Sequence, residues 1–140
     1  YVTGVQTCAL PISALAEQLE LEEAGYPATV EQGHAAVRFT NPTTGGDVMP
    51  TIRAEFHRLR AGTTTRTRRT SGSQVFQVFD GAAEVLLGDE RQHVEKGDLF
   101  CVPSWVPFGM SSDDGVDLFG FGDGPIVERL SLDRTHVEEV

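Results

Sequence analysis

The sequence predicts an all-β domain, an antiparallel β-sandwich or barrel, on three observations. Apolar and polar residues alternate along residues 53–60, which is the period-two pattern of a half-buried strand. Further short apolar stretches follow, each bounded by glycine, aspartate or proline. With 140 residues and 39% hydrophobic content, the chain is long enough to bury a single core. Many short strands at even spacing are typical of sandwiches and barrels.

The first twelve residues look unlike the rest of the chain. The sequence begins with Tyr1 rather than methionine, and residues 3–12 resemble the translated read-through of a sequencing adapter. A signal peptide is the alternative, but the segment has neither a basic start nor an adequate apolar core. We therefore predict that residues 1–12 are a non-native tail outside the fold, and that the natural chain continues upstream of this C-terminal piece.

Residues 13–37 are predicted to form a helix and a linker. Strong helix formers follow Ser13, whose side chain suits an N-cap, and Leu15 and Leu19 share one helix face. The Gly-Tyr-Pro stretch at residues 25–27 ends the helix. Two alternatives remain open for it: a linker helix that packs on a preceding domain, or a frayed surface helix.

Residues 38–140 are predicted to form the β domain. A loop of turn formers at residues 38–46 leads into the strand of residues 53–60, in which His57 is expected to face solvent. Five more strands are predicted, at residues 74–79, 83–87, 91–94, 99–102 and 116–121. Asp80-Gly81 and Gly88-Asp89 are predicted to be tight turns between strands. A short helix is expected after Gly124, and Ile126, Val127, Leu130 and Leu132 are expected to pack it against the barrel.

The stretch from Gly62 to Gly81 has the spacing of a metal-binding motif. Arg68 and Thr70 follow Gly62 after five residues, Gln74 comes three residues later, and Gly81 closes the stretch. A second stretch runs from Gly97 through Pro103 to Phe108. The two stretches resemble the two cupin motifs, in which three histidines and a glutamate stand at the positions of Arg68, Thr70, Gln74 and Phe108. This resemblance implies a cupin double-stranded β-helix, a jelly-roll barrel, with an N-terminal helix and a short C-terminal helix.

Five blocks narrow the resemblance to one family. They are residues 41–46, 49–52, 74–81, 102–107 and 118–123. In order and in register, across about residues 38–132, they resemble the C-terminal half of the gentisate 1,2-dioxygenases, a family that includes salicylate and 1-hydroxy-2-naphthoate dioxygenases. The resemblance implies an enzyme with two cupins that opens an aromatic ring with Fe(II) and O2. In that family the iron belongs to the N-terminal cupin, and this chain is expected to represent only the C-terminal one.

The residues at the four ligand positions argue against a metal in this barrel. Arg68 is cationic and has no lone pair to donate, Thr70 offers a weak neutral oxygen, Gln74 has no charge, and Phe108 has no donor atom. We therefore expect no metal and no catalytic residue in this chain, which on its own is predicted to be inactive. The four residues are instead candidates for lining a pocket.

Other chemically active side chains have mostly structural interpretations. The four histidines are expected to be exposed: His34 in a polar loop, His57 on a strand, His93 at a strand end and His136 in the tail. Cys101 is expected to be a small buried hydrophobe. Trp105, between two prolines, could line a pocket or an interface, although packing in a core or loop is the alternative.

Three outcomes are open for Arg68, whose guanidinium points into the barrel if the cupin register holds. A buried acid pairs with it, or the side chain reaches solvent together with Arg66 and Arg69, or a small aromatic carboxylate binds it.

Composition and charge limit the partners. No apolar run approaches the length of about 18 residues that a membrane-spanning helix needs. The net charge of −10 argues against nucleic acid and anionic membranes. Six arginines nevertheless form a local basic patch: Arg53, Arg58, Arg60, Arg66, Arg68 and Arg69. Cys8 and Cys101 form no disulfide framework, which fits a reducing cytoplasm.

Two functions remain. In the first, the chain is the metal-free C-terminal cupin of a gentisate-type dioxygenase, where it supports the missing N-terminal cupin and a homo-oligomer. In the second, it is a free-standing cupin that binds a small carboxylate or acts as an assembly module. A chain that lacks its partner barrel should also expose an apolar patch and self-associate.

Overall fold

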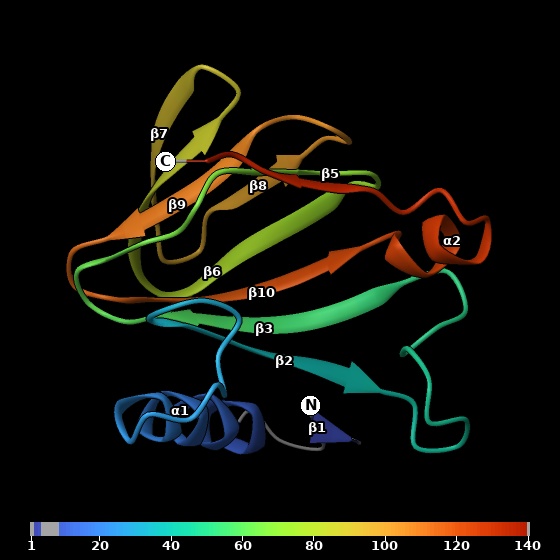
Figure 1. Ribbon diagram of the computed structural model, residues 1–140, viewed down its shortest axis with the longest axis horizontal. Coiled ribbons are helices and arrows are strands. Elements are labelled where there is room, and N and C mark those ends of the chain that lie inside the picture. Colours follow the sequence, from blue (N-terminus) through green and yellow to red (C-terminus); the bar gives the residue numbers. More distant parts are fainter. Residues whose placement is uncertain (1, 4–8, 140) are drawn as a thin grey trace.

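A curled, mostly antiparallel sheet forms most of the protein (Figure 1). The computed structural model describes residues 2–3 and 9–139. The strands are β1 (Val2–Thr3), β2 (His34–Thr40), β3 (Arg53–Leu59), β4 (Thr63–Thr64), β5 (Arg68–Thr70), β6 (Gln74–Leu87), β7 (Glu90–Glu95), β8 (Leu99–Val102), β9 (Phe108–Ser112), β10 (Val116–Gly122) and β11 (Thr135–Val137). The helices are α1 (Ala9–Glu23) and α2 (Gly124–Arg129). An all-β fold with an N-terminal helix and a short C-terminal helix is therefore confirmed.

Strand β6 runs through both halves of the curled sheet. Its first half pairs with β10 and β8, and its second half pairs with β7 and β9. The predicted turn at Asp80-Gly81 is therefore wrong, because the pairing with β10 slips there and makes a bulge inside one strand. Gly81 has a φ of +84°, and an added Cβ would lie 2.3 Å from the carbonyl oxygen of Gly115. The glycine is needed for a bend in the strand rather than for a hairpin.

Most of the other predicted strands are confirmed. The predictions at residues 53–60, 91–94, 99–102 and 116–121 correspond to β3, β7, β8 and β10, and Gly88-Asp89 connects β6 to β7. The strands that were not predicted are β1, β2, β4, β5, β9 and β11. β2 had a usable signal, because Ala35, Val37 and Phe39 alternate with Ala36 and Arg38.

Helix α1 begins before the predicted start. Ser13 lies inside it, so its predicted N-cap role is wrong. The exclusion of residues 1–12 from the fold is wrong for Ala9–Ile12, which belong to α1, and for Val2–Thr3, which form β1 and pair with β2. Residues 4–8 lie outside the described residues, and the origin of the segment stays a prediction. The predicted end is confirmed, since the N–H groups of Gly25 and Tyr26 donate to the carbonyls of Glu22 and Leu21 at 2.9 and 3.0 Å.

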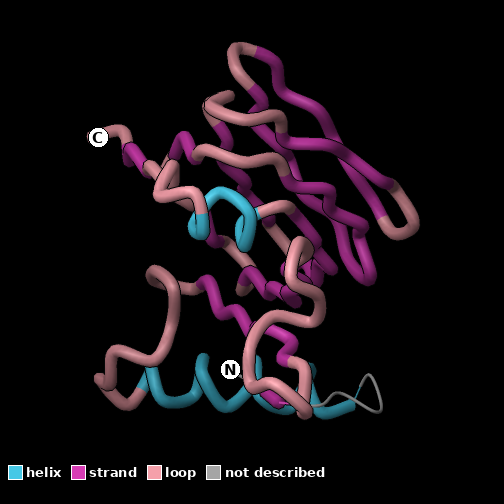
Figure 2. The backbone as a smooth tube through the Cα atoms, turned by 90° about the vertical axis from the view of Figure 1, so that its right-hand side faces the viewer, coloured by secondary structure: helices cyan, strands magenta, loops and turns pink. Residues whose placement is uncertain are grey.

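Helix α1 covers part of the outer face of the sheet (Figure 2). Leu15 is fully buried against Ala35, Val37 and Phe56. The Gln18 side chain donates to the carbonyl of Ala36 at 2.9 Å and accepts from its N–H at 3.2 Å. The frayed surface helix is therefore wrong, because α1 packs on its own sheet. That the helix also packs on a preceding domain stays a prediction.

The inner face of the sheet encloses the main core. Its apolar members come from six strands and are Leu59, Phe76, Val78, Ala83, Val85, Val94, Phe100, Val102, Met110, Val116 and Leu118. On β3, Ala54 and Phe56 face outward and are 8% and 5% exposed. Glu55 and His57 consequently point to the inside of the curl.

Helix α2 lies at one end of the sheet (Figure 1). Pro125 is its buried residue, whereas Ile126, Leu130 and Leu132 are 39%, 62% and 58% exposed. The expected packing of these three side chains on the barrel is therefore wrong. Arg53 instead binds Glu128 of α2 with hydrogen bonds of 2.6 and 2.9 Å. Within the described residues, neither helix is long and apolar enough to cross a membrane.

Candidate functional site

Four residues from three strands meet at one cavity. Arg68 and Thr70 lie on β5, Gln74 begins β6, and Phe108 begins β9 directly opposite Arg68. All four line a cavity of about 260 Å³. The structure thus brings together the residues that the motif spacing singled out, because β5, β6 and β9 belong to one sheet.

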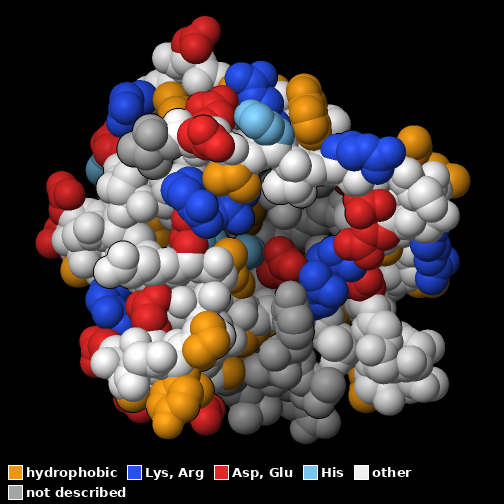
Figure 3. Space-filling model, in the orientation of Figure 1, with side chains coloured by type: hydrophobic (Ala, Val, Ile, Leu, Met, Phe, Trp, Pro, Cys, Tyr) orange, Lys and Arg blue, Asp and Glu red, His pale blue; other side chains and the backbone are white. Residues whose placement is uncertain are grey.

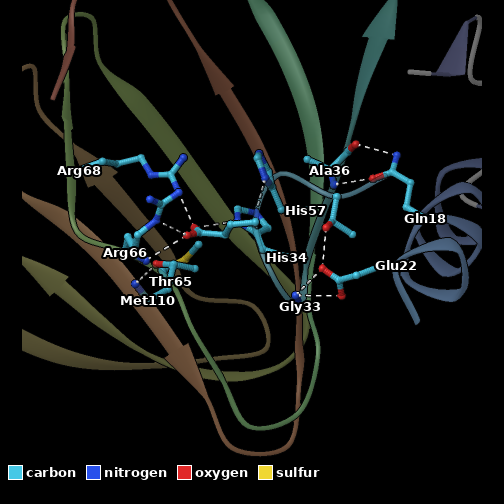
Figure 4. Close-up of polar contacts among 12 residues, drawn as sticks. Gln18, Glu22, Gly33, His34, Ala36, His57, Thr65, Arg66, Arg68 and Met110 are labelled. Atoms are coloured by element: carbon cyan, nitrogen blue, oxygen red, sulfur yellow. Dashed lines mark hydrogen bonds and ion pairs between the residues drawn. The ribbon is translucent and has the colours of Figure 1, made fainter. Parts of the chain in front are cut away.

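Glu31 is the anionic centre of this cavity, and the sequence analysis missed it. Its carboxylate accepts hydrogen bonds from Nη2 of Arg68 at 2.5 Å and from the backbone N–H of Arg66 at 3.2 Å, and it lies 3.6 Å from Nδ1 of His34 (Figure 4). The side chain is 9% exposed. Burial alone would raise the pKa of Glu31, but His34, the Arg66 N–H and the Arg68 charge together lower it to about 2.

Of the three outcomes open for Arg68, the pairing with a buried acid is therefore the one observed. The segment that carries Glu31 had no sequence signal beyond polarity, because its contacts come from residues 35 and 37 positions further along the chain.

His34 and His57 face each other inside the curl (Figure 4). Nε2 of His34 lies 3.0 Å from Nδ1 of His57. The predicted exposure is wrong for both: His34 lies on β2 and is 6% exposed, and the His57 side chain is 12% exposed. The alternating pattern identified the two faces of β3 correctly but not their surroundings, since α1 covers the apolar face and the curl encloses the polar one.

The pKa of His34 is lowered. Burial is the largest cause, the charges of His57 and Arg68 act in the same direction, and contact with Glu31 opposes them only in part.

Glu55 lies next to His57, on the side of the histidine pair opposite Glu31. One carboxylate oxygen lies 3.3 Å from Nε2 of His57, and the other lies 3.6 Å from Nε of Arg38. Burial alone would raise the pKa of Glu55, but His57, Arg38 and Arg53 outweigh burial and lower it. Glu55 is therefore a buried anion.

Aromatic rings form the opposite wall. Phe76 stacks on Phe100 and on Phe108, with ring centroids 5.3 and 5.6 Å apart. Its ring also meets His57 at 5.6 Å with an interplanar angle of 70°. The cavity therefore has a charged side and an apolar side.

The residues at the cavity do not fit an iron site. Arg68, Thr70, Gln74 and Phe108 supply neither imidazole nor carboxylate. The facing nitrogens of His34 and His57 contact each other and do not converge on a third point. In the part of the chain that the structure describes, no group of three or more His, Cys, Asp or Glu side chains could hold a metal ion.

Of the alternatives left open for Trp105, lining of this cavity is not observed, and Cys101 lies elsewhere than expected. Trp105 does not line this cavity. Its side chain is 46% exposed, and its backbone N–H donates to the backbone carbonyl of Thr70 at 2.8 Å. Cys101 is exposed rather than buried, because Phe100 and Val102 are the members of β8 that face inward. The predicted exposure of His93 and His136 is confirmed.

Carboxylates neutralise the arginines of the predicted basic patch. Arg53 pairs with Asp47 and Glu128, Arg58 with Asp117, Arg60 with Glu22 and Glu23, Arg66 and Arg68 with Glu31, and Arg69 with Glu138. Figure 3 shows basic and acidic side chains side by side around a hollow on this face. The patch therefore offers no continuous positive surface.

An apolar surface remains open on the outer face of the sheet, beyond the part that α1 covers. We call it the outer apolar face; it consists of Phe79, Leu99, Cys101 and Phe121 on β6, β8 and β10. Phe79, Leu99 and Phe121 are 41%, 66% and 42% exposed. Phe79 also touches the buried Phe56 edge to face at 5.4 Å, so this surface continues the cluster under α1.

Known proteins are similar to this chain in sequence. Residues 55–118 match the model described as "Cupin domain". The chain is 53% identical over 123 residues to a gentisate 1,2-dioxygenase of Streptomyces sp, a match that covers 88% of this chain and 34% of that protein. It is 31% identical over 100 residues to a 1-hydroxy-2-naphthoate 1,2-dioxygenase of Nocardioides sp. (strain KP7), covering 69% of this chain and 26% of that protein.

Solved structures agree. The salicylate 1,2-dioxygenase of Pseudoaminobacter salicylatoxidans with gentisate superposes with a TM-score of 0.92 at 57% identity, over 96% of this chain and 37% of the other. A cupin from Shewanella frigidimarina superposes with a TM-score of 0.57 at 20% identity, which supports the fold alone. The predicted cupin jelly roll is confirmed. The chain spans about a third of the length of the curated relatives it matches.

Proposed function

We propose that the chain is a cupin of the gentisate 1,2-dioxygenase family, and that it forms the metal-free C-terminal cupin of a larger, Fe(II)-dependent ring-cleaving dioxygenase of the cytoplasm. Its role is to support a second, iron-bearing cupin and the assembly of the enzyme. Taken alone, the chain opens no aromatic ring.

One observation carries the proposal. The four ligand positions of the cupin motif converge on one cavity, yet they hold Arg68, Thr70, Gln74 and Phe108. The fold is therefore retained while its usual metal chemistry is lost. Two carboxylates, Glu31 and Glu55, stand in the same cavity and remain anionic, which suits a structural ion-pair network better than a site for a substrate carboxylate.

The outer apolar face supports the assembly role. Phe79, Leu99 and Phe121 expose large side chains on adjacent strands, and such surfaces on soluble domains commonly mark protein contacts. This chain covers 34% of the Streptomyces relative and 37% of the Pseudoaminobacter relative, so both contain further segments, one of which we propose covers this face. We propose that the iron-bearing cupin or a second copy of the enzyme does so.

A chimera tests the proposal. The segment of the Streptomyces gentisate 1,2-dioxygenase that matches this chain is replaced by residues 9–140, which include the whole of α1, and ring opening of gentisate is followed with Fe(II) and O2. We expect an active chimera with the iron content of the parent. A chimera that is soluble but inactive, or that has lost its native oligomer, contradicts the supporting role.

The isolated chain provides the complementary measurement. After purification with added Fe(II), we expect no stoichiometric iron and no ring opening. Stoichiometric iron would overturn the assignment of a metal-free cupin. Saturable binding of salicylate near Arg68 would instead support the alternative of a free-standing carboxylate-binding cupin.

A further inference from the structure

Four buried side chains form one continuous row across the cavity. Glu31 precedes β2, His34 begins β2, and His57 and Glu55 lie on β3. The three contacts along the row are 3.6 Å from Glu31 Oε1 to His34 Nδ1, 3.0 Å between the imidazoles, and 3.3 Å from His57 Nε2 to Glu55 Oε2. His34 Nδ1 and His57 Nε2 are buried, and neither has a hydrogen-bond partner of good geometry.

Two neutral imidazoles cannot make all three contacts of this row favourable. A neutral pair carries two N–H groups for three contacts. If one N–H lies between the rings, one outer nitrogen presents its lone pair to a carboxylate. If both N–H groups point outward, two lone pairs meet between the rings at 3.0 Å. Every placement of the two N–H groups therefore leaves at least one repulsive contact, and a third proton on the pair removes it.

We propose that the His34–His57 pair is a buried proton-binding site that holds one proton more than the neutral pair. The three N–H groups then bind Glu31, join the two rings, and bind Glu55. The row becomes a continuous hydrogen-bonded link from the segment before β2 to β3. A fourth proton would place two N–H groups against each other at 3.0 Å and is rejected.

The surrounding charges permit one extra proton but not two. Glu31 and Glu55 contact the imidazoles directly and favour it. The basic groups are held by those same carboxylates: Arg66 and Arg68 on Glu31, and Arg38 on Glu55, with Arg53 acting on Glu55 from further away. The other cavity-lining side chains of β6 and β9 are uncharged, namely Gln74, Phe76, Phe108 and Met110. The lowered pKa of His34 agrees with rejection of a second proton.

Nitrogen-15 NMR of the whole chain, labelled at histidine, tests the proposal by counting protonated ring nitrogens at about pH 6, where ordinary histidines are mostly charged. We expect three protonated nitrogens in the His34–His57 pair, with both rings responding to the same titration step. The exposed His93 and His136 serve as internal references. Two protonated nitrogens in the pair, or four, would overturn the proposal.

Glu55→Gln gives a matched second measurement. Loss of the carboxylate 3.3 Å from His57 should weaken the proton affinity of the pair by about tenfold or more and return it to two protonated nitrogens at the same pH. The control is Glu84→Gln, which removes the carboxylate beside the exposed His93 and should leave the pair unchanged. If Glu55→Gln does not fold, the count in the unmodified chain still decides.

Discussion

The interior of this barrel has two parts that are filled in opposite ways. In one, Phe76, Val78 and Leu118 are at most 2% exposed and touch other apolar side chains. In the other, Glu31, His34 and their partners are held together by ion pairs and hydrogen bonds. Burial of apolar surface stabilises without a specific partner, whereas each buried ion depends on its counterpart. The apolar part therefore provides most of the stability of the cupin fold. The polar part requires particular partner residues and makes the stability depend on pH.

The largest expected effect lies in the apolar part. Leu118→Ala should lower the free energy of unfolding by about 2–5 kcal/mol, because Leu118 is fully buried and the substitution leaves a cavity. Urea unfolding measures it. Leu132→Ala is the control, since Leu132 is 58% exposed and its loss should cost within about 0.5 kcal/mol. Equal decreases in the free energy of unfolding of the two variants would contradict the prediction that burial of Leu118 stabilises the fold.

Removing the central charge of the polar part should have the next largest effect. Glu31→Gln leaves Arg68 without its carboxylate and should cost about 2 kcal/mol, less than a fully buried pair would, because water partly screens the Arg66 contact. Asp80→Asn, which breaks the exposed pair with Lys96, should change stability by less than about 0.5 kcal/mol. If the two variants unfold at the same urea concentration, the buried network contributes nothing specific.

Acid should weaken the polar part in two steps. The folded pKa of His34 lies below that of an unfolded imidazole, about 6.5, so its contribution is present above that pH and is lost as pH falls toward the folded value. Glu31 has a folded pKa of about 2 against 4.5, so its contribution is lost between pH 4.5 and 2.

Urea midpoints recorded from pH 7.5 downward check both steps. His34→Gln should flatten the first decline, and Glu31→Gln should flatten the second. The Leu118→Ala variant should lose stability by the same amount at every pH, because its apolar neighbours do not titrate. A wild-type midpoint that stays constant from pH 7.5 to 3 would contradict the assignment.

The smallest effect on stability is expected at the outer apolar face. Leu99→Lys should change the free energy of unfolding by less than about 0.5 kcal/mol, since the side chain is 66% exposed. It should nevertheless shift the isolated chain toward monomer in sedimentation experiments, because a charge then interrupts the apolar surface. Leu132→Lys, outside that face, is the matched control. A wild-type chain that is already monomeric at high concentration would contradict the docking role.

Much of the fold could be predicted because local sequence patterns indicate most of its strands. Alternation on β3 and β10, the hairpin glycine at Gly88 and the cupin spacing from Gly62 to Gly81 gave strands close to those observed. The predictions failed where pairing rather than local preference makes the strand. β5 is three polar residues long and exists because it pairs with β9 and β11.

The candidate site was half predictable. Arg68, Thr70, Gln74 and Phe108 were found because motif spacing places them on one barrel wall. Glu31, His34, His57 and Glu55 were missed because no local pattern distinguishes a polar residue facing solvent from one facing an enclosed cavity. His57 shows this directly: its strand position was predicted correctly, and its environment was not.

The jelly roll, its similarity to the ring-cleaving dioxygenases and the lack of metal-ligand side chains at the motif positions could all be predicted, because motif spacing and side-chain chemistry are local properties of the sequence. Which charges are buried together follows from the tertiary structure. Glu31 meets Arg68 across 37 positions of sequence, and His34 meets His57 across 23. Electrostatic energy depends on distance in space and on burial, and the closing of the sheet sets both.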